Sequence, residues 1–301
     1  MLHFINLLLL ANLLLGFFQG GDATLFSGMF HTNRLIVLEK SMLNLATLIV
    51  SLQAYSWLKG HRQVLEFYML LLSTLLGFFF MISSGNLLIF YLGLELSTIP
   101  LAALSSFDLE KRRSSEAAMK FILSSAFSSA LLLFGISLLY GATGTLGFDT
   151  LAGRLDGSAF QLFAFIFILS GFAFKISAVP FHLWTADVYE GSPVTVTAYL
   201  SVVSKGAVFF IFILALYTVF KPLAGNWYKI VVLLSVLTMV TGNLFALRQD
   251  GLKRLLAFSS IAQSGFILAG ITGSSRGGEA SVIYFILVYI FSNLGAFGVV
   301  S

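Results

Sequence analysis

The sequence predicts an all-α polytopic membrane protein with about ten transmembrane helices. Only 10% of its 301 residues are charged, against about 25% in soluble proteins. Hydrophobic residues make up 58% of the chain, which leaves too little polar surface to cover a soluble domain. A transmembrane helix needs about 20 apolar residues, so a chain of this length with short connections accommodates roughly ten spans.

Ten apolar stretches follow one another along the chain. Turns rich in glycine, serine or charged residues separate them, as at 83–86, 108–113 and 273–278. The stretches cover residues 2–18, 34–58, 65–84, 86–106, 115–140, 160–179, 194–219, 228–247, 253–272 and 280–301.

The first and last stretches allow more than one interpretation. The run 2–18, followed by Gln19-Gly20-Gly21, is similar to a secretory signal, but it lacks the Lys or Arg that begins one. We therefore favour a membrane helix. The last stretch reaches Ser301 inside an apolar helical pattern with no cap, and we expect the sequence to be cut short.

The basic residues indicate orientation. They are scattered through short connections and form no run, so nucleic acid is not an expected partner. Cytoplasmic loops carry an excess of Lys and Arg. If residues 160–191 cross the membrane once, the larger group and the amino terminus are cytoplasmic. That group is Lys59, Arg62, Lys111, Arg112, Arg113, Arg248, Lys253 and Arg254, and the smaller one is Arg34, Arg154, Lys221, Lys229 and Arg276.

The chain contains no cysteine. It therefore cannot form disulfides, bind an iron–sulfur cluster through thiolates or attach haem covalently. It also lacks the glycine-rich nucleotide motifs, HExxH and a nucleophile elbow. We expect no cofactor and no metal on this chain, and any redox chemistry to lie on a partner.

Three ionisable residues lie near the middle of apolar segments. A charge at the bilayer centre costs at least about 2.5–3.5 kcal/mol and usually has a function. Glu95 lies next to the midpoint of 86–106, and Lys205 lies close to the midpoint of 194–219. The third is Lys175, because residues 160–191 would span about 48 Å as one helix, against a core of about 30 Å. Pro180 predicts a break there, which makes Lys175 central.

A buried lysine and a carboxylate can act as a proton switch. At a separation of about 5 Å and an effective dielectric of about 20, their attraction is roughly 3 kcal/mol. Pairing with Glu95 would keep Lys175 protonated, and separation would let the proton leave. The alternative is a structural ion pair that only holds helices together. The same alternative stays open for Lys205.

Lys120 and His182 are further candidates. Glu116 lies four residues before Lys120, so an intrahelical ion pair near the interface competes with a role in proton movement. His182 lies beside Trp184, and we favour a packing histidine at the membrane interface over a proton shuttle. The serines at 124, 125, 128 and 129, with Gly135, are interpreted as small residues that allow close helix contact.

Three long motifs resemble the antiporter-like membrane subunits of respiratory complex I, NADH:quinone oxidoreductase. They are Tyr91-Leu92-Gly93-Leu94-Glu95-Leu96-Ser97-Thr98-Ile99-Pro100-Leu101, the run Gly171 to Trp184, and Asp187-Val188-Tyr189-Glu190-Gly191-Ser192-Pro193. The third motif, continuing to Lys205, is similar to the subunit N branch, the counterpart of mitochondrial subunit 2. One position departs, because Ala186 stands where family members usually carry proline.

The resemblance implies a proton-translocating subunit built from two inverted five-helix repeats, each with a broken helix. It divides the chain into amino-terminal helices at 1–64, a complete first repeat at 65–219 and an incomplete second repeat at 228–301. It assigns Glu95, Lys175 and Lys205 to the proton path, in a multi-pass protein of the bacterial plasma membrane. NADH, flavin, iron–sulfur clusters and quinone would bind partner subunits, and the other membrane subunits and the lipid bilayer would be its neighbours.

Two alternatives remain open. The same helices serve in subunits of cation/proton antiporters and of membrane-bound hydrogenases, without NADH. A non-transporting membrane scaffold is the other alternative, and under it an apolar pair would replace Glu95 and Lys175 without loss.

Overall fold

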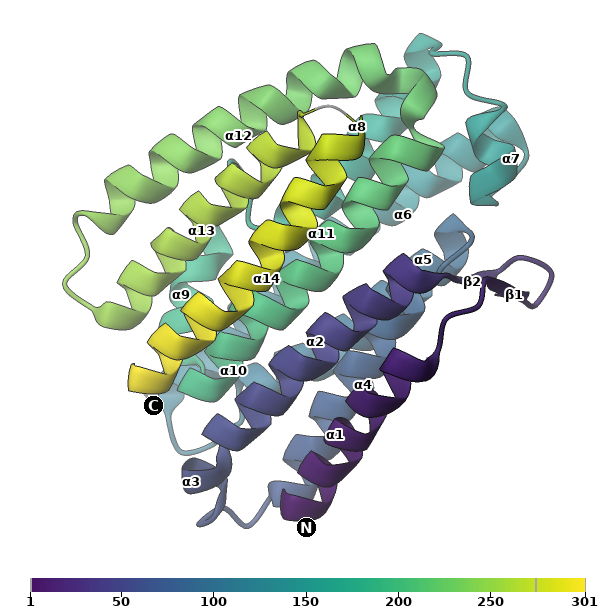
Figure 1. Cartoon of the computed structure of the whole chain (residues 1–301). Coiled ribbons are helices and arrows are strands. Elements are labelled where there is room, and N and C mark those ends of the chain that lie inside the picture. Colours follow the sequence, from purple (N-terminus) through teal and green to yellow (C-terminus); the bar gives the residue numbers. More distant parts are fainter. Residues whose placement is uncertain (1, 274, 301) are drawn as a thin grey trace.

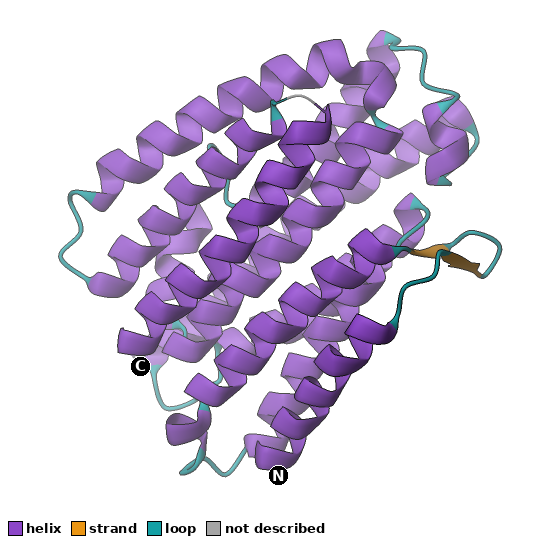
Figure 2. Ribbon diagram, viewed as in Figure 1, coloured by secondary structure: helices purple, strands orange, loops and turns teal. Residues whose placement is uncertain are grey.

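All ten apolar stretches form helices of a single bundle (Figures 1 and 2). The computed structural model describes residues 2–273 and 275–300; Met1, Ser274, Ser301 and the side chains of Ser275 and Arg276 lie outside the described part. Eight described helices are long and apolar enough to cross a membrane. The all-α polytopic architecture predicted from the sequence is confirmed, and the chain is a multi-pass membrane protein.

The first half of the bundle contains the helices that position Glu95 and Lys175. Pro100 lies inside the helix that carries Glu95, which continues beyond it to Ser105. The elements are α1 (Leu2–Phe18), β1 (Ala23–Leu25), β2 (Phe30–Thr32), α2 (Arg34–Gln53), α3 (Tyr55–Leu58), α4 (Val64–Ile82), α5 (Leu87–Ser105), α6 (Arg112–Thr143), α7 (Phe148–Ala152) and α8 (Ala159–Lys175).

The second half begins after the helix break. The segment 194–219 is continuous but contains two π-helical turns. Of its apolar 18-residue stretch, 78% is buried, which places the segment at the centre of the bundle. The elements are α9 (Leu183–Gly191), α10 (Val194–Tyr199), π-turn η1 (Leu200–Ser204), α11 (Lys205–Leu214), π-turn η2 (Ala215–Val219), 3₁₀-turn η3 (Lys221–Leu223), α12 (Ala224–Ala246), α13 (Leu252–Ile271) and α14 (Ser275–Val300).

Glycines let neighbouring helices approach closely in two places. A Cβ on Gly77 of α4 would lie 2.5 Å from the backbone nitrogen of Ser97 in α5. A Cβ on Gly135 of α6 would lie 2.8 Å from the carbonyl oxygen of Ala164 in α8. Small residues are the usual means of close packing between membrane helices, so the predicted role of Gly135 is confirmed.

A short β-hairpin, which the sequence analysis did not identify, lies between α1 and α2. Its strands pair antiparallel, with Ala23 opposite Thr32. The amide of Gly85 donates to the carbonyl of Met29 at 2.7 Å, which ties the hairpin to the turn between α4 and α5. A Cβ on Gly85 would lie 2.0 Å from the carbonyl oxygen of Gly28, so this turn requires glycine.

The larger group of basic residues gathers at one end of the bundle. The Asp108 carboxylate, in the loop between α5 and α6, lies 2.8 Å from Lys111 and 3.9 Å from His61 in the preceding loop. Arg113 and Arg254 both lie beside Glu190 at the end of α9. Figure 1 shows the hairpin and α7 at the opposite end. The single crossing assumed for residues 160–191 agrees with this arrangement.

Candidate functional site

The helix break occurs where Pro180 predicts it. Helix α8 ends at Lys175 and α9 begins at Leu183, with the Val179–Pro180 peptide bond in cis between them. Side chains bond backbone groups around the break: the Val179 amide donates to Thr238 Oγ1 at 3.0 Å, and Trp184 Nε1 donates to the Phe174 carbonyl at 3.2 Å. Irregular backbone inside a membrane is tolerated only where protein or water satisfies it in this way.

Lys175 is buried at the end of α8, with 8% of its surface exposed. Its Nζ donates to Thr98 Oγ1 of α5 at 2.6 Å and to Ser125 Oγ of α6 at 2.8 Å. Thr98 and Ser125 lie well inside α5 and α6, away from the ends of both helices. The ammonium group is therefore held by two hydroxyls in the interior of the bundle.

Glu95 does not form the direct ion pair with Lys175 that a structural pair would require. No oxygen of Glu95 lies within 4.0 Å of a described basic nitrogen, and its buried Oε1 has no hydrogen-bond partner among the described residues. Glu95 lies one helical turn before Thr98 on α5 and acts on Lys175 electrostatically across that distance. The hydroxyls of Thr98 and Ser125 take the place of the predicted contact.

Lys205 lies at the junction between the π-turn η1 and α11, with 3% of its surface exposed. Its Nζ donates to Ser260 Oγ of α13 at 2.6 Å. The hydroxyls of Ser201 and Tyr289 also lie within 3.2 Å of Ser260 Oγ. Turns of π-helix are frequent at functional sites, and this one places a second buried cation beside a cluster of three hydroxyls.

Aromatic rings connect the two lysines. The Lys175 ammonium lies 6.0 Å from the centre of the Phe174 ring, which stacks on Trp184 at 5.2 Å. Trp184 contacts Tyr189 edge to face at 6.4 Å, and the Lys205 ammonium lies 5.7 Å from the Tyr189 ring. Rings attract cations through their faces, so α9 links the environments of both buried lysines.

Lys120 belongs to a different cluster. Its Nζ lies 2.8 Å from Glu116 Oε1 and 2.7 Å from Asp187 Oδ2, and its side chain is 44% exposed. The predicted intrahelical pair is present, extended by Asp187 to Arg254 at 2.9 Å. This cluster lies at the end of the bundle that carries the larger group of basic residues, outside the buried axis.

His182 lies in the break itself, immediately before α9. Its side chain is buried, and Nδ1 has no hydrogen-bond partner in the part of the chain that the structure describes. The structure therefore places the His182 side chain inside the bundle, immediately before α9. Its role as a packing histidine at the membrane interface stays a prediction.

Sequence reasoning missed the hydroxyl partners. Ser125 was interpreted only as a small packing residue, and neither Ser260 nor Tyr289 was considered. Each comes from a helix far from its lysine in the sequence, separated by 50 residues in the case of Ser125 and by 55 in the case of Ser260. A buried serine at the same depth as a buried lysine was the available signal, but the sequence does not show which helices are neighbours.

The fold and the site define a class: a polytopic helical bundle with a broken helix and buried lysines at mid-depth. A family model described as NADH:quinone oxidoreductase/Mrp antiporter, TM, matches residues 84–301. The chain belongs to this family.

Individual relatives agree. The NADH-quinone oxidoreductase subunit N of Phocaeicola vulgatus is 50% identical over 284 residues, which are 93% of this chain and 60% of the relative. A chain of respiratory complex I from Thermus thermophilus superimposes with a TM-score of 0.81 at 31% identity, over 97% of this chain and 62% of that one. A chain of the Mrp complex from Dietzia sp. has a TM-score of 0.83 at 21% identity and shares the fold. This chain spans about 60% of the length of the first two proteins.

Proposed function

We propose that this chain translocates protons as the subunit N of a bacterial NADH:quinone oxidoreductase, in the inner membrane. Two relatives, 50% and 48% identical to this chain, carry that name. Redox energy would come from partner subunits that bind NADH, flavin, iron–sulfur clusters and quinone, because this chain has no cysteine to hold such a cluster. Other membrane subunits of the complex and the lipid bilayer would surround it.

The observation that carries the proposal is the state of Lys175. It is buried and bonded to two hydroxyls, and no carboxylate oxygen of the described residues lies within 4.0 Å of its Nζ. A structural ion pair compensates the cost of burying a charge by direct contact, and Lys175 lacks that compensation. A buried ammonium held only by neutral groups can lose its proton without leaving an unpaired carboxylate beside it. Such a group is suited to carrying a proton.

The proton would pass from Lys175 to Lys205 under the influence of Glu95. The break between α8 and α9 and the π-turn before Lys205 are two departures from regular helix within the core of the bundle. Transporters place ion sites at such irregular positions. We propose the same division as the family: amino-terminal helices at 1–64, a first repeat at 65–219 and part of a second at 228–301.

A loss-of-charge variant tests the function. Lys175→Ala should abolish redox-driven proton translocation in sealed membrane vesicles while the chain remains inserted. Full translocation by this variant would overturn the assignment. The double variant Glu95→Leu with Lys175→Met distinguishes this function from the scaffold alternative. An apolar pair should preserve assembly of the complex but destroy the proton path.

Cation/proton antiport is the second candidate, since the matched family description names Mrp antiporters together with quinone oxidoreductases. The two differ in the source of energy. Vesicles carrying the complex should acidify when given NADH and quinone if the first candidate holds. Acidification only in response to a sodium gradient would favour the second.

A further inference from the structure

Helix α2 carries a buried carboxylate that the proposed proton path does not include. Glu39 has 6% of its surface exposed. Within the described part of the chain it forms no ion pair, and its side chain makes no hydrogen bond. An unpaired carboxylate inside a membrane bundle is costly, and such residues commonly mark ion or proton pathways.

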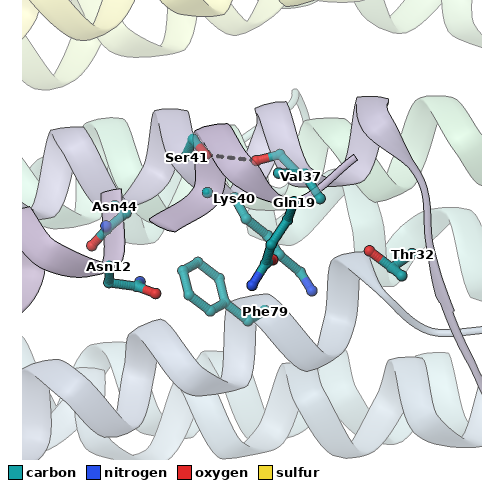
Figure 3. A pocket seen from close by; sticks show the side chains of 9 residues that line it. Asn12, Gln19, Thr32, Val37, Lys40, Ser41, Asn44 and Phe79 are labelled. Carbon is teal, nitrogen blue, oxygen red and sulfur yellow. Dashed lines mark hydrogen bonds between the residues drawn. The ribbon is translucent and has the colours of Figure 1, made fainter. Parts of the chain in front are cut away.

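The neighbouring Lys40 acts electrostatically on Glu39 but forms no ion-pair contact with it among the described residues. Figure 3 shows Lys40 in a pocket with Asn12, Gln19 and Phe79 along its walls. This pocket has a volume of about 160 Å³, and Glu39 does not line it. The Lys40 ammonium lies 5.7 Å from the centre of the Phe79 ring. Adjacent residues on a helix point about 100° apart, so the side chains of Glu39 and Lys40 lie on different sides of α2.

The face of α2 that carries Glu39 packs toward α11 and α14. Leu43 lies one turn further along the same face of α2. A Cβ on Gly206 would lie 3.5 Å from side-chain carbons of both Leu43 and Ile286, so the three helices meet there. Gly206 directly follows Lys205. Glu39 is therefore about one helical turn, roughly 5 Å along the bundle, from the level of Lys205, toward the end where α2 begins.

Glu279 lies at the same end, in the second turn of α14. It is partly exposed and acts electrostatically on both Glu39 and Tyr217. Tyr217 lies close by, because its hydroxyl donates to the Ile271 carbonyl and would be 2.7 Å from a Cβ on Gly278. The larger group of basic residues lies at the other end of the bundle, so Glu279 is at the non-cytoplasmic end.

We propose that Glu39 carries protons between Lys205 and the non-cytoplasmic surface, with Glu279 as the acceptor at the mouth of this route. The proposal rests on the proton-translocating function above. The Glu39 carboxyl, protonated at rest because it is buried without a described ion-pair partner, gives its proton to the Glu279 carboxylate and thence to bulk water, and the Lys205 ammonium then reprotonates Glu39 through water. No electron moves. Glu39 and Glu279 return to their starting protonation states, and Lys205 is left as a neutral amine until Lys175 supplies the next proton.

Three variants of the assembled complex test this route. Glu39→Gln keeps the shape but cannot carry a proton as a carboxyl does, and it should slow redox-driven translocation by about tenfold or more, as loss of a proton-transfer group does. Glu39→Asp should retain most of the rate. Glu110→Gln, at an exposed loop carboxylate, is the matched control and should retain all of it. Full translocation by Glu39→Gln overturns the proposal. An equal loss of translocation in Glu39→Gln and Glu39→Asp also overturns it, because that result indicates that Glu39 only packs.

Two further measurements separate this proposal from the proposed function. The infrared carbonyl band of a protonated carboxyl should disappear from the purified complex in Glu39→Gln, whether or not the complex pumps. Because the chain has no cysteine, Glu279→Cys gives it a single thiol, which an impermeant maleimide should label only from the non-cytoplasmic side. If Glu39→Gln translocates protons and Lys175→Ala does not, only the Glu39 route is refuted. If Lys175→Ala translocates protons, the proposed function and the Glu39 route are both refuted.

Discussion

Lys175 donates a 2.6 Å hydrogen bond to the Thr98 hydroxyl, and Thr98 lies one helical turn from Glu95 on the same helix. The carboxylate thus acts on the lysine across a hydroxyl, without touching it. This arrangement places the ammonium under electrostatic control by Glu95 while leaving its proton bonded to neutral groups. A small movement of α5 would change that control without breaking an ion pair.

Removing one hydroxyl from Lys175 should weaken both stability and transport. In Ser125→Ala, the buried ammonium loses one of its two acceptors, so we expect the free energy of unfolding to fall by about 1–3 kcal/mol and translocation to slow. Ser128→Ala is the control, because Ser128 Oγ is buried on the same helix and has no hydrogen-bond partner within the described ranges. Denaturant unfolding and vesicle assays measure the two effects, and equal behaviour of the variants would refute the role of Ser125.

The hydroxyl cluster around Lys205 gives a second prediction. Ser260 accepts the hydrogen bond from Lys205, whereas Tyr289 bonds to Ser260 and not to the lysine. Ser260→Ala should therefore reduce the rate of proton translocation more than Tyr289→Phe. The opposite order, measured in the same vesicles, would show that Tyr289 has the more direct role.

Lys120 should be dispensable for transport. Its side chain is 44% exposed and its ion pairs with Glu116 and Asp187 lie outside the buried axis. Exposed ion pairs contribute about 0–1 kcal/mol, so Lys120→Ala should change the unfolding free energy by no more than about 1 kcal/mol. We expect the variant to keep most of the translocation rate; a loss as complete as that of Lys175→Ala would place Lys120 on the path.

Two glycines of α6 should respond oppositely to alanine. A Cβ on Gly135 would meet the backbone of α8 at 2.8 Å, whereas a Cβ on Gly141 would have nothing within 4 Å. Overpacking costs about 1–3 kcal/mol, so Gly135→Ala should destabilise the purified protein. Gly141→Ala should leave stability unchanged or raise it by up to about 1 kcal/mol. Similar unfolding midpoints would contradict the close contact between α6 and α8.

The sequence predicted the helices and the charged axis because both depend on local signals. Runs of about 20 apolar residues mark spans, and the length of 160–191 with Pro180 marks the break. Counting along each span located Glu95, Lys175 and Lys205 at mid-depth. The hairpin was missed because strands of three residues carry no alternating pattern. Glu39 was missed because it lies near the start of its span, where counting indicates an interface, and only the packing of α2 against other helices buries it.

The most direct test of the account is Lys175→Arg in the assembled complex, with NADH-driven proton translocation measured in sealed vesicles. Arginine keeps the positive charge at this position but is not deprotonated in proteins. If Lys175 carries protons, the variant should assemble and fail to translocate them. Translocation at the unmodified rate by Lys175→Arg would show that only a fixed positive charge is needed there, and it would contradict the account.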